Sequence, residues 1–162
     1  MAVSDPLFLD KSNPELWNSI GKFANQLAKS YQAAGISDRL AELVNLRVSQ
    51  INGCAYCLDL HARKAIDAGE SLQRINLLST WNECGGLFDE EECAALAIAE
   101  AATTLPTPEE RIAAVASARL VFTDEQVAAL QWIAVAMNAF NRISVLSRHP
   151  VKDRTLTESA QQ

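Results

Sequence analysis

The sequence has few basic residues, no long apolar run and little cysteine, and each shortage excludes a class of protein. Fourteen Lys and Arg stand against twenty Asp and Glu, so the formal net charge is −6 and the pI is near 4.9. Nucleic acids and anionic membrane surfaces are bound through clustered Lys and Arg, so neither is an expected partner. The apolar runs fall far short of the roughly 20 residues that a membrane-spanning helix needs.

The first residues and the cysteine content limit the location. The start, MAVSDPLFLDKSNPELW, has no basic stretch followed by an apolar block, and so it does not read as a signal peptide. Four cysteines in 162 residues are too few for a disulfide-stapled scaffold, which is shorter and denser in cysteine. We therefore expect a cytoplasmic protein, where a close cysteine pair is more often redox-active or metal-binding than structural.

What the chain does have is helical periodicity along most of its length. Apolar residues recur three or four positions apart, and no segment shows the sustained alternation of a strand. Thr107 and Thr123 are each followed three residues later by Glu or Gln, which predicts two capping boxes. We expect an all-α bundle of six or seven helices. The expected helices cover about 15–34, 37–51, 54–69, 71–81, 90–104, a stretch from 107, and 123–144.

One short segment, INGCAYCLDLHARKA, carries a concentration of reactive side chains. On a helix that begins at Gly53, Cys57 lies about 60° and His61 about 20° from Cys54 around the axis, so all three share one narrow face. Cys57 and His61 are four residues apart and therefore neighbours on successive turns. A thiol in the first helical turn beside a histidine is expected to have a lowered pKa.

This arrangement suits the reduction of a peroxide. A thiolate attacks the O–O bond and becomes a sulfenic acid, and a second thiol three residues away condenses with it to form a disulfide. The histidine can take the thiol proton and return one to the leaving alkoxide. Two other interpretations stay open: a metal site, including one formed by Cys54, Cys57, His61 and Glu42, and a packing accident with inert thiols.

The wider segment ELVNLRVSQINGCAYCLDLHARKAIDAGES resembles the core of the AhpD-like alkylhydroperoxidases, within the carboxymuconolactone decarboxylase superfamily. That motif has a glutamate twelve residues before C-x-x-C-x-x-x-H, and here it is formed by Glu42, Cys54, Cys57 and His61. The resemblance extends over about residues 37–146. It implies a single AhpD-like domain over 1–162, with an N-terminal helix in 1–36 and a loose tail at 150–162.

The resemblance also implies an activity: reduction of organic hydroperoxides, with attack by Cys57, resolution by Cys54, and proton relay through Glu42 and His61. Helix-dipole reasoning alone favours Cys54 as the attacking thiol instead. The implied partners are a dithiol reductant, in some members a lipoylated protein, and further copies of the chain in a trimer or hexamer. We expect no cofactor and no bound metal. The alternative function is a thiol–disulfide exchange or redox-sensing module with little peroxide turnover.

Several residues depart from the motif or have a simpler explanation. Tyr56 stands where the best-studied peroxidases of this type have a histidine between the cysteines. On its own helix Glu42 falls on the polar side, which by itself indicates a solvated carboxylate. We expect His149 to be exposed and without a role, and we expect the pair Asn141-Arg142 to end the last long helix. Cys84 and Cys93 are expected to be small buried hydrophobic residues.

Overall fold

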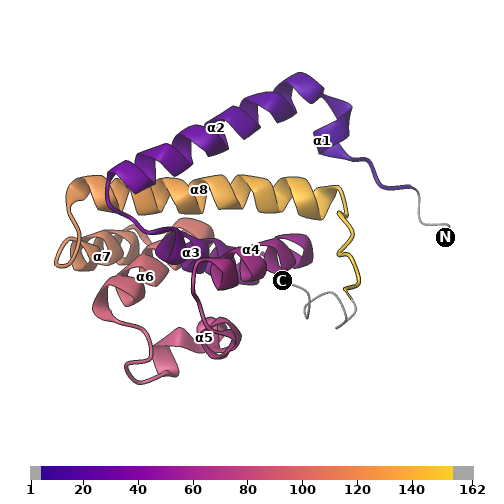
Figure 1. Cartoon of the computed structure of the whole chain (residues 1–162). Helices are drawn as coiled ribbons and strands as arrows, with labels where there is room; N and C mark the ends of the chain where they lie inside the picture. The colour runs from indigo at the N-terminus through magenta and orange to yellow at the C-terminus, as the bar shows by residue number, and fades with distance from the viewer. Residues whose placement is uncertain (1–4, 155–162) are drawn as a thin grey trace.

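The computed structural model describes residues 5–154, and every regular element in that range is a helix (Figure 1). The elements are α1 (Leu9–Ser12), α2 (Pro14–Ala33), α3 (Asp38–Ile51), α4 (Ala55–Asp67), α5 (Leu72–Leu77), the 3-10 helix η1 (Leu78–Glu83), α6 (Glu90–Thr104), α7 (Pro108–Ala118) and α8 (Asp124–Leu146). The all-α prediction is therefore confirmed. One α-helix was not predicted: α1, which has only four residues.

The helix starts follow from local side-chain chemistry. Both predicted capping boxes are present: the hydroxyls of Thr107 and Thr123 accept hydrogen bonds from the backbone N–H of Glu110 and Gln126, whose side chains bond back to the cap residue. These reciprocal bonds satisfy backbone groups that have no partner inside the helix. The sequence therefore fixes where α7 and α8 begin.

The predicted helix over 71–81 is wrong in its second half. The α-helix ends at Leu77 and continues as η1, within which Thr80 leaves helical geometry at φ −123° and ψ 30°. Side chains offer the backbone carbonyls other partners here. The hydroxyl of Thr80 donates to the Leu77 carbonyl at 3.1 Å, and the Cys84 thiol donates to the Thr80 carbonyl at 3.3 Å. Such local bonds compete with the α-helical pattern.

The helix α3 lies at the centre of the molecule. It packs against α4, α6 and α8, and Figure 1 shows it beneath α8 with α2 crossing on the opposite side of α8. Leu43, Val44 and Val48 of α3 are fully buried. This packing holds α3, α4 and α8 together, and these three helices carry the side chains of the site.

The break between α3 and α4 requires a glycine. Gly53 has φ +64°, a left-handed conformation that residues with a side chain rarely adopt. Cys54 follows in an extended conformation at φ −88° and ψ 92° and is the N-cap residue, so α4 begins at Ala55. The predicted start at about Cys54 is correct to one residue.

The ends of the chain bear on two expectations. Residues 150–154 form no regular element, and the rest of the expected loose tail, 155–162, lies outside the described residues, as do residues 1–4. Within residues 5–154, no helix combines the length and the apolar character that spanning a membrane demands.

Candidate active site

The two cysteines of the C-x-x-C segment lie in the interior, at the start of α4. Cys54 is 1% exposed and Cys57 is 3% exposed, and both are free thiols. The Cys54 backbone N–H donates to the Ser49 carbonyl at 3.0 Å, which ties the segment to the end of α3. The Cys54 thiol lies within hydrogen-bonding reach of the Cys57 thiol. The two sulfur atoms therefore lie on the same side of the helix start.

Glu42 and His61 form a buried pair that joins α3 to α4. Nδ1 of His61 lies 2.5 Å from Oε2 of Glu42, and each residue is 8% exposed. The carboxylate accepts, so Nδ1 of the neutral imidazole carries the hydrogen and Nε2 keeps its lone pair. The polar face that indicated a solvated Glu42 is covered by α4, and the carboxylate is buried and partnered instead.

The surroundings of Cys57 oppose its ionisation. Burial raises the pKa of Cys57 from 9.0 to about 11, and the neighbouring Cys54 thiol acts in the same direction. The side chains of Ser144 and Asn141 lie beside the sulfur and act to lower the pKa, but they do not offset the burial. The expectation of a lowered thiol pKa is therefore wrong for Cys57, because the thiol is removed from water.

A cavity of about 780 Å³ reaches the site between α2, α3, α4 and α8. Cys57, His61 and Glu42 are all on its wall, whereas Cys54 is not. The opposite walls are apolar and come from α2 and α8. Their side chains include Trp17, Leu27, Ile133, Met137 and Phe140.

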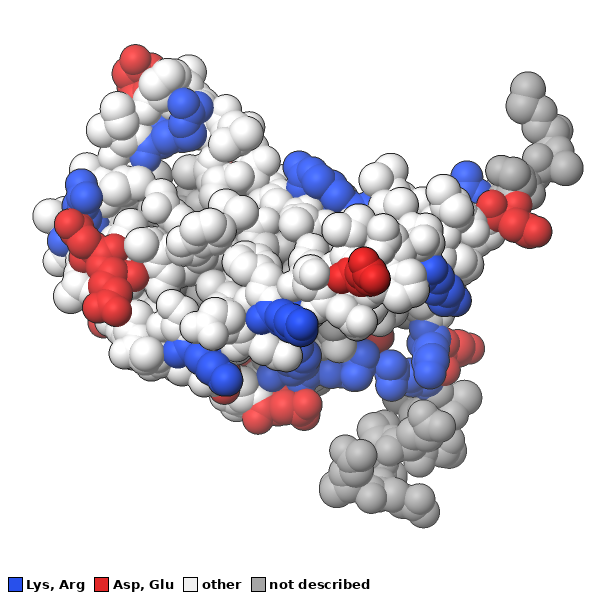
Figure 2. All heavy atoms as spheres, turned by 90° about the horizontal axis from the view of Figure 1, so that it is seen from above, with Lys and Arg blue, Asp and Glu red and all other residues white. Residues whose placement is uncertain are grey.

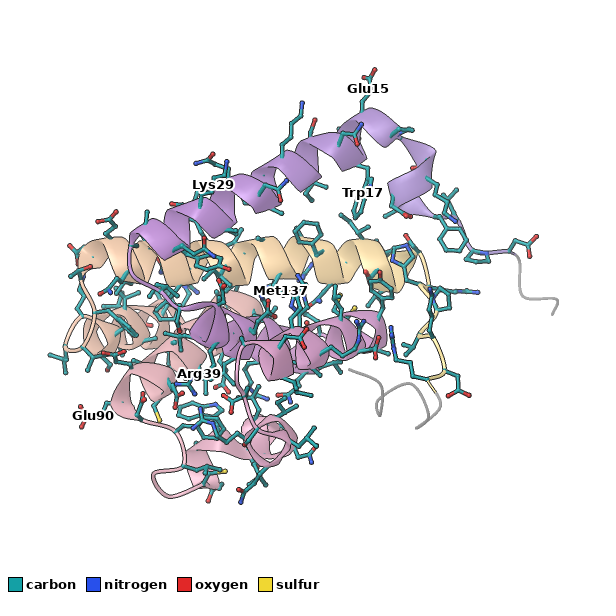
Figure 3. All side chains as sticks on the ribbon, viewed as in Figure 1. Glu15, Trp17, Lys29, Arg39, Glu90 and Met137 are labelled. Carbon is teal, nitrogen blue, oxygen red and sulfur yellow. The ribbon has the colours of Figure 1, made fainter. Side chains whose placement is uncertain are left out.

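Figure 3 shows Trp17 extending from α2 toward α8, and its ring meets that of Phe140 edge to face with centroids 6.4 Å apart. Because these walls are apolar and the reactive groups lie together, the cavity suits a molecule with a hydrocarbon body and one polar end.

The cavity wall has more cationic than acidic residues, unlike the chain as a whole. The wall includes five cationic residues and three acidic ones, although the whole sequence has a net charge of −6. The cationic residues are Lys11, Arg63, Lys64, Lys152 and Arg154, and the acidic ones are Asp10, Glu42 and Asp59. Asp59 pairs with two of the cations, Arg63 at 3.1 Å and Arg154 at 3.5 Å.

Three residues near Cys57 have positions that the sequence analysis did not predict. Asn141 is 1% exposed inside α8, where its amide donates to the Ser49 hydroxyl at 3.1 Å, so it does not end the helix. Ser144, one turn further along, is on the cavity wall. The expectation that His149 is exposed is wrong: its side chain is 13% exposed and lies on the same wall. The only sequence signal was the spacing of three residues between Asn141 and Ser144 on one helix, and His149, beyond the end of α8, had none.

The other two cysteines lie away from this cavity. Neither Cys84 nor Cys93 is on its wall, and both are partly exposed, with their thiols directed at backbone carbonyls of η1 and Phe88. In the part of the chain that the structure describes, no group of three or more His, Cys, Asp or Glu is arranged to hold a metal ion.

Comparison with known proteins places these features in a family. The sequence model of the carboxymuconolactone decarboxylase family matches residues 14–101. The uncharacterized protein YdfG of Bacillus subtilis is 38% identical over 127 residues, which are 76% of this chain and 84% of that protein.

A solved structure is also similar. It is a protein of unknown function from Agrobacterium tumefaciens, suggested to be the antioxidant defence protein AhpD. It superposes with a TM-score of 0.79 and 32% identity, over 92% of this chain and all of that chain. The chain therefore belongs to the carboxymuconolactone decarboxylase family, as an AhpD-like member.

Proposed function

We propose that this protein is a thiol-dependent peroxidase that reduces organic hydroperoxides through a Cys54–Cys57 dithiol cycle. The Cys57 thiolate attacks the terminal oxygen of the hydroperoxide, the O–O bond breaks, and Cys57 becomes a sulfenic acid. The alkoxide takes a proton and leaves as the alcohol. The Cys54 thiol then displaces water from the sulfenic acid, which leaves a disulfide. Overall, two thiols and one hydroperoxide give one disulfide, one alcohol and one water.

One observation carries this proposal: Cys57 faces the cavity together with the Glu42–His61 pair, while Cys54 lies against it on the closed side. A hydroperoxide that enters the cavity meets Cys57 first. Cys54 has no route to the substrate, but it is placed to condense with an oxidised Cys57. This supports attack by Cys57 and resolution by Cys54.

The raised pKa of Cys57 gives the Glu42–His61 pair its role. With a pKa of about 11, roughly one Cys57 thiol in 10⁴ is ionised at neutral pH, so the thiol proton has to be removed as the peroxide reacts. His61, one turn along α4 on the same wall, has an imidazole lone pair for that proton. Glu42 holds Nδ1 and stabilises the imidazolium that forms.

The apolar walls support a hydroperoxide with a hydrocarbon body. They also have to admit the reductant that returns the disulfide to the dithiol form. A dithiol on a hydrocarbon arm, such as a dihydrolipoyl group on a partner protein, has the required length and polarity. We place this cycle in the cytoplasm, where dithiols stay reduced.

We further propose that the chain works as a homo-oligomer, a trimer or hexamer, through the face that carries α2. No residue of α2 is buried, and Leu16 is 68% and Trp17 is 40% exposed. Figure 2 views the molecule onto this face and shows a broad uncharged area with most charged residues toward its margins. Exposed apolar side chains such as Leu16 and Trp17, on a face with few charges, are typical of interfaces.

Peroxide consumption with a dithiol reductant tests the proposal. Wild type should consume cumene hydroperoxide, and Cys57→Ser and Cys54→Ser should both abolish turnover. A second function, thiol–disulfide exchange or redox sensing, is favoured by one observation, the raised pKa of Cys57. Under that function the disulfide still forms on oxidation, but wild-type turnover with peroxide stays at the level of Cys57→Ser.

A further inference from the structure

The second histidine of the chain forms a hydrogen-bonded row with two residues that are far apart in the sequence. Nε2 of His149 lies 3.1 Å from Oδ1 of Asp10, and Nδ1 lies 3.2 Å from the hydroxyl of Ser144. All three residues line the cavity that contains Cys57. The chain has only two histidines, and both are on this wall.

Several contacts hold His149 in place. The His149 ring stacks on Phe8 with centroids 5.7 Å apart, and the Tyr56 ring packs against it at 5.2 Å. The backbone N–H of Leu9 donates to the Ser147 hydroxyl at 3.0 Å, which fastens α1 to the end of α8. The chain therefore brings α1, α4 and the segment after α8 together around one imidazole.

The hydrogen-bond roles in this row are fixed by Asp10. Its carboxylate accepts, so Nε2 of the neutral imidazole carries the hydrogen and Nδ1 is an acceptor. Nδ1 then accepts the Ser144 hydroxyl hydrogen, and the Ser144 oxygen keeps lone pairs for a further donor. Ser144 also lies beside the Cys57 sulfur, which is on the same wall.

We propose that Ser144, His149 and Asp10 form a second proton path to Cys57, separate from the Glu42–His61 pair. The Cys57 thiol passes its proton to the Ser144 oxygen as the Ser144 hydroxyl passes its own to Nδ1 of His149. The Asp10 carboxylate holds Nε2–H and stabilises the imidazolium. After the O–O bond breaks, the same proton returns to the alkoxide and gives the alcohol, so no proton is gained or lost. Ser144 is the member of the row that lies next to Cys57, and His149 and Asp10 are positioning residues that act through it.

The proposal rests on the proposed attack by Cys57, but it concerns residues outside the segment that the family model matches. The family model ends at residue 101 and begins at residue 14, so Asp10, Ser144 and His149 all lie outside the matched segment.

A double-mutant cycle tests the path, with Cys54→Ser and His61→Gln as the common background, so that only Cys57 of the pair reacts and the Glu42–His61 pair does not hide the second path. The variants are Ser144→Ala, His149→Gln and the two combined. The rate of sulfenic acid formation with cumene hydroperoxide is followed by trapping and mass spectrometry. Each single variant is expected to slow the reaction at neutral pH by about tenfold or more, as for loss of a positioned proton-transfer group. The double variant should be no slower than the slower single variant, because both substitutions interrupt the same proton path.

Asp10→Asn provides a variant that leaves both ends of the path in place, and Asp153→Asn is its matched control. Asp153 is exposed and is not on the cavity wall. Asp10→Asn should slow the reaction, and Asp153→Asn should leave it unchanged. Rates that stay at the level of the common background in Ser144→Ala and His149→Gln, or single effects that multiply in the double variant, would overturn the proposal.

A second readout separates this proposal from the proposed function. Alkylation of Cys57 by iodoacetamide also requires loss of the thiol proton but needs no peroxide activity. If wild type forms no sulfenic acid, the peroxidase proposal fails, and the alkylation rates still decide the path. The same pattern of slowing across the variants supports it, and equal alkylation rates contradict it.

Discussion

The replacement of His61 by glutamine gives a prediction whose size follows from the pKa of Cys57. The pKa of about 11 lies about four units above neutral pH, so ionising the thiol before attack costs roughly 5 kcal/mol. A general base that removes the proton during attack typically contributes a factor of about 10² to 10⁴. His61→Gln should therefore lower the rate constant for reaction with a hydroperoxide at pH 7 by about 100-fold or more.

The pH dependence gives the sharper test, in a variant that combines His61→Gln with Ser144→Ala so that the proposed Ser144–His149 path is also removed. With neither path present, the rate should follow the thiolate fraction and rise about tenfold for each pH unit until the pH approaches 11. The deficit relative to wild type should then shrink toward alkaline pH. Stopped-flow measurement of Cys57 oxidation in a Cys54→Ser background provides both rates.

Glu42→Gln serves as the companion variant, since it keeps a hydrogen-bonding side chain but removes the charge that stabilises the imidazolium. It should slow the reaction in the same direction as His61→Gln. Its matched control is Asp67→Asn, an exposed carboxylate further along α4 that is not on the cavity wall. The reasoning is refuted if His61→Gln reacts within about twofold of wild type at pH 7, or if the deficit of the combined His61→Gln and Ser144→Ala variant does not change with pH.

Three further predictions concern stability and substrate. Because the folded-state pKa of Cys57 is raised from 9.0 to about 11, unfolding measurements should show stability falling between these pH values by roughly 3 kcal/mol, a loss that Cys57→Ser reduces. Arg74→Ala removes one of two arginine partners from each of two buried carboxylates, Glu70 at 2.8 Å and Glu92 at 2.6 Å. The loss of these two charged hydrogen bonds should lower the free energy of unfolding by about 3 kcal/mol in urea titrations, where an unchanged midpoint would contradict it. A fatty-acid hydroperoxide should have a lower KM than its methyl ester, and Lys64→Glu with Lys152→Glu should remove the difference. Equal KM values in wild type would count against a role for the cationic wall.

The sequence predicts the helices well because their limits depend on neighbouring residues. The capping boxes at Thr107 and Thr123 and the break at Gly53 are local, and each is found where the pattern places it. The fourth expected helix fails at Thr80 for an equally local reason, but one that periodicity does not register. The side chains there bond to backbone carbonyls and turn the α-helix into a 3-10 helix.

The candidate site could be predicted only in part from the sequence. Cys54, Cys57 and His61 could be placed on one face because they share one helix start. Glu42 is buried because α4 packs across α3. The pattern of polar and apolar residues along α3 alone does not predict that contact. The same applies to the pKa of Cys57, since the spacing indicates a neighbouring histidine but not the loss of solvent around the sulfur.

The row formed by Asp10, Ser144 and His149 shows the same limit more strongly. Asp10 and His149 are 139 residues apart in the chain, and nothing in the sequence between them signals a contact. His149 follows the last helix and precedes a proline, which indicates an exposed turn. Only the packing of α1 on the end of α8 makes it part of the cavity wall.

The measurement that tests the central claim most directly is the mass of the protein after one equivalent of an organic hydroperoxide. The account predicts that wild type loses two hydrogen atoms and shows a Cys54–Cys57 disulfide on peptide mapping, while Cys54→Ser gains one oxygen atom, on Cys57. A sulfenic acid on Cys54 in the Cys57→Ser variant, formed as fast as wild type reacts, would contradict it. So would wild-type protein whose mass does not change.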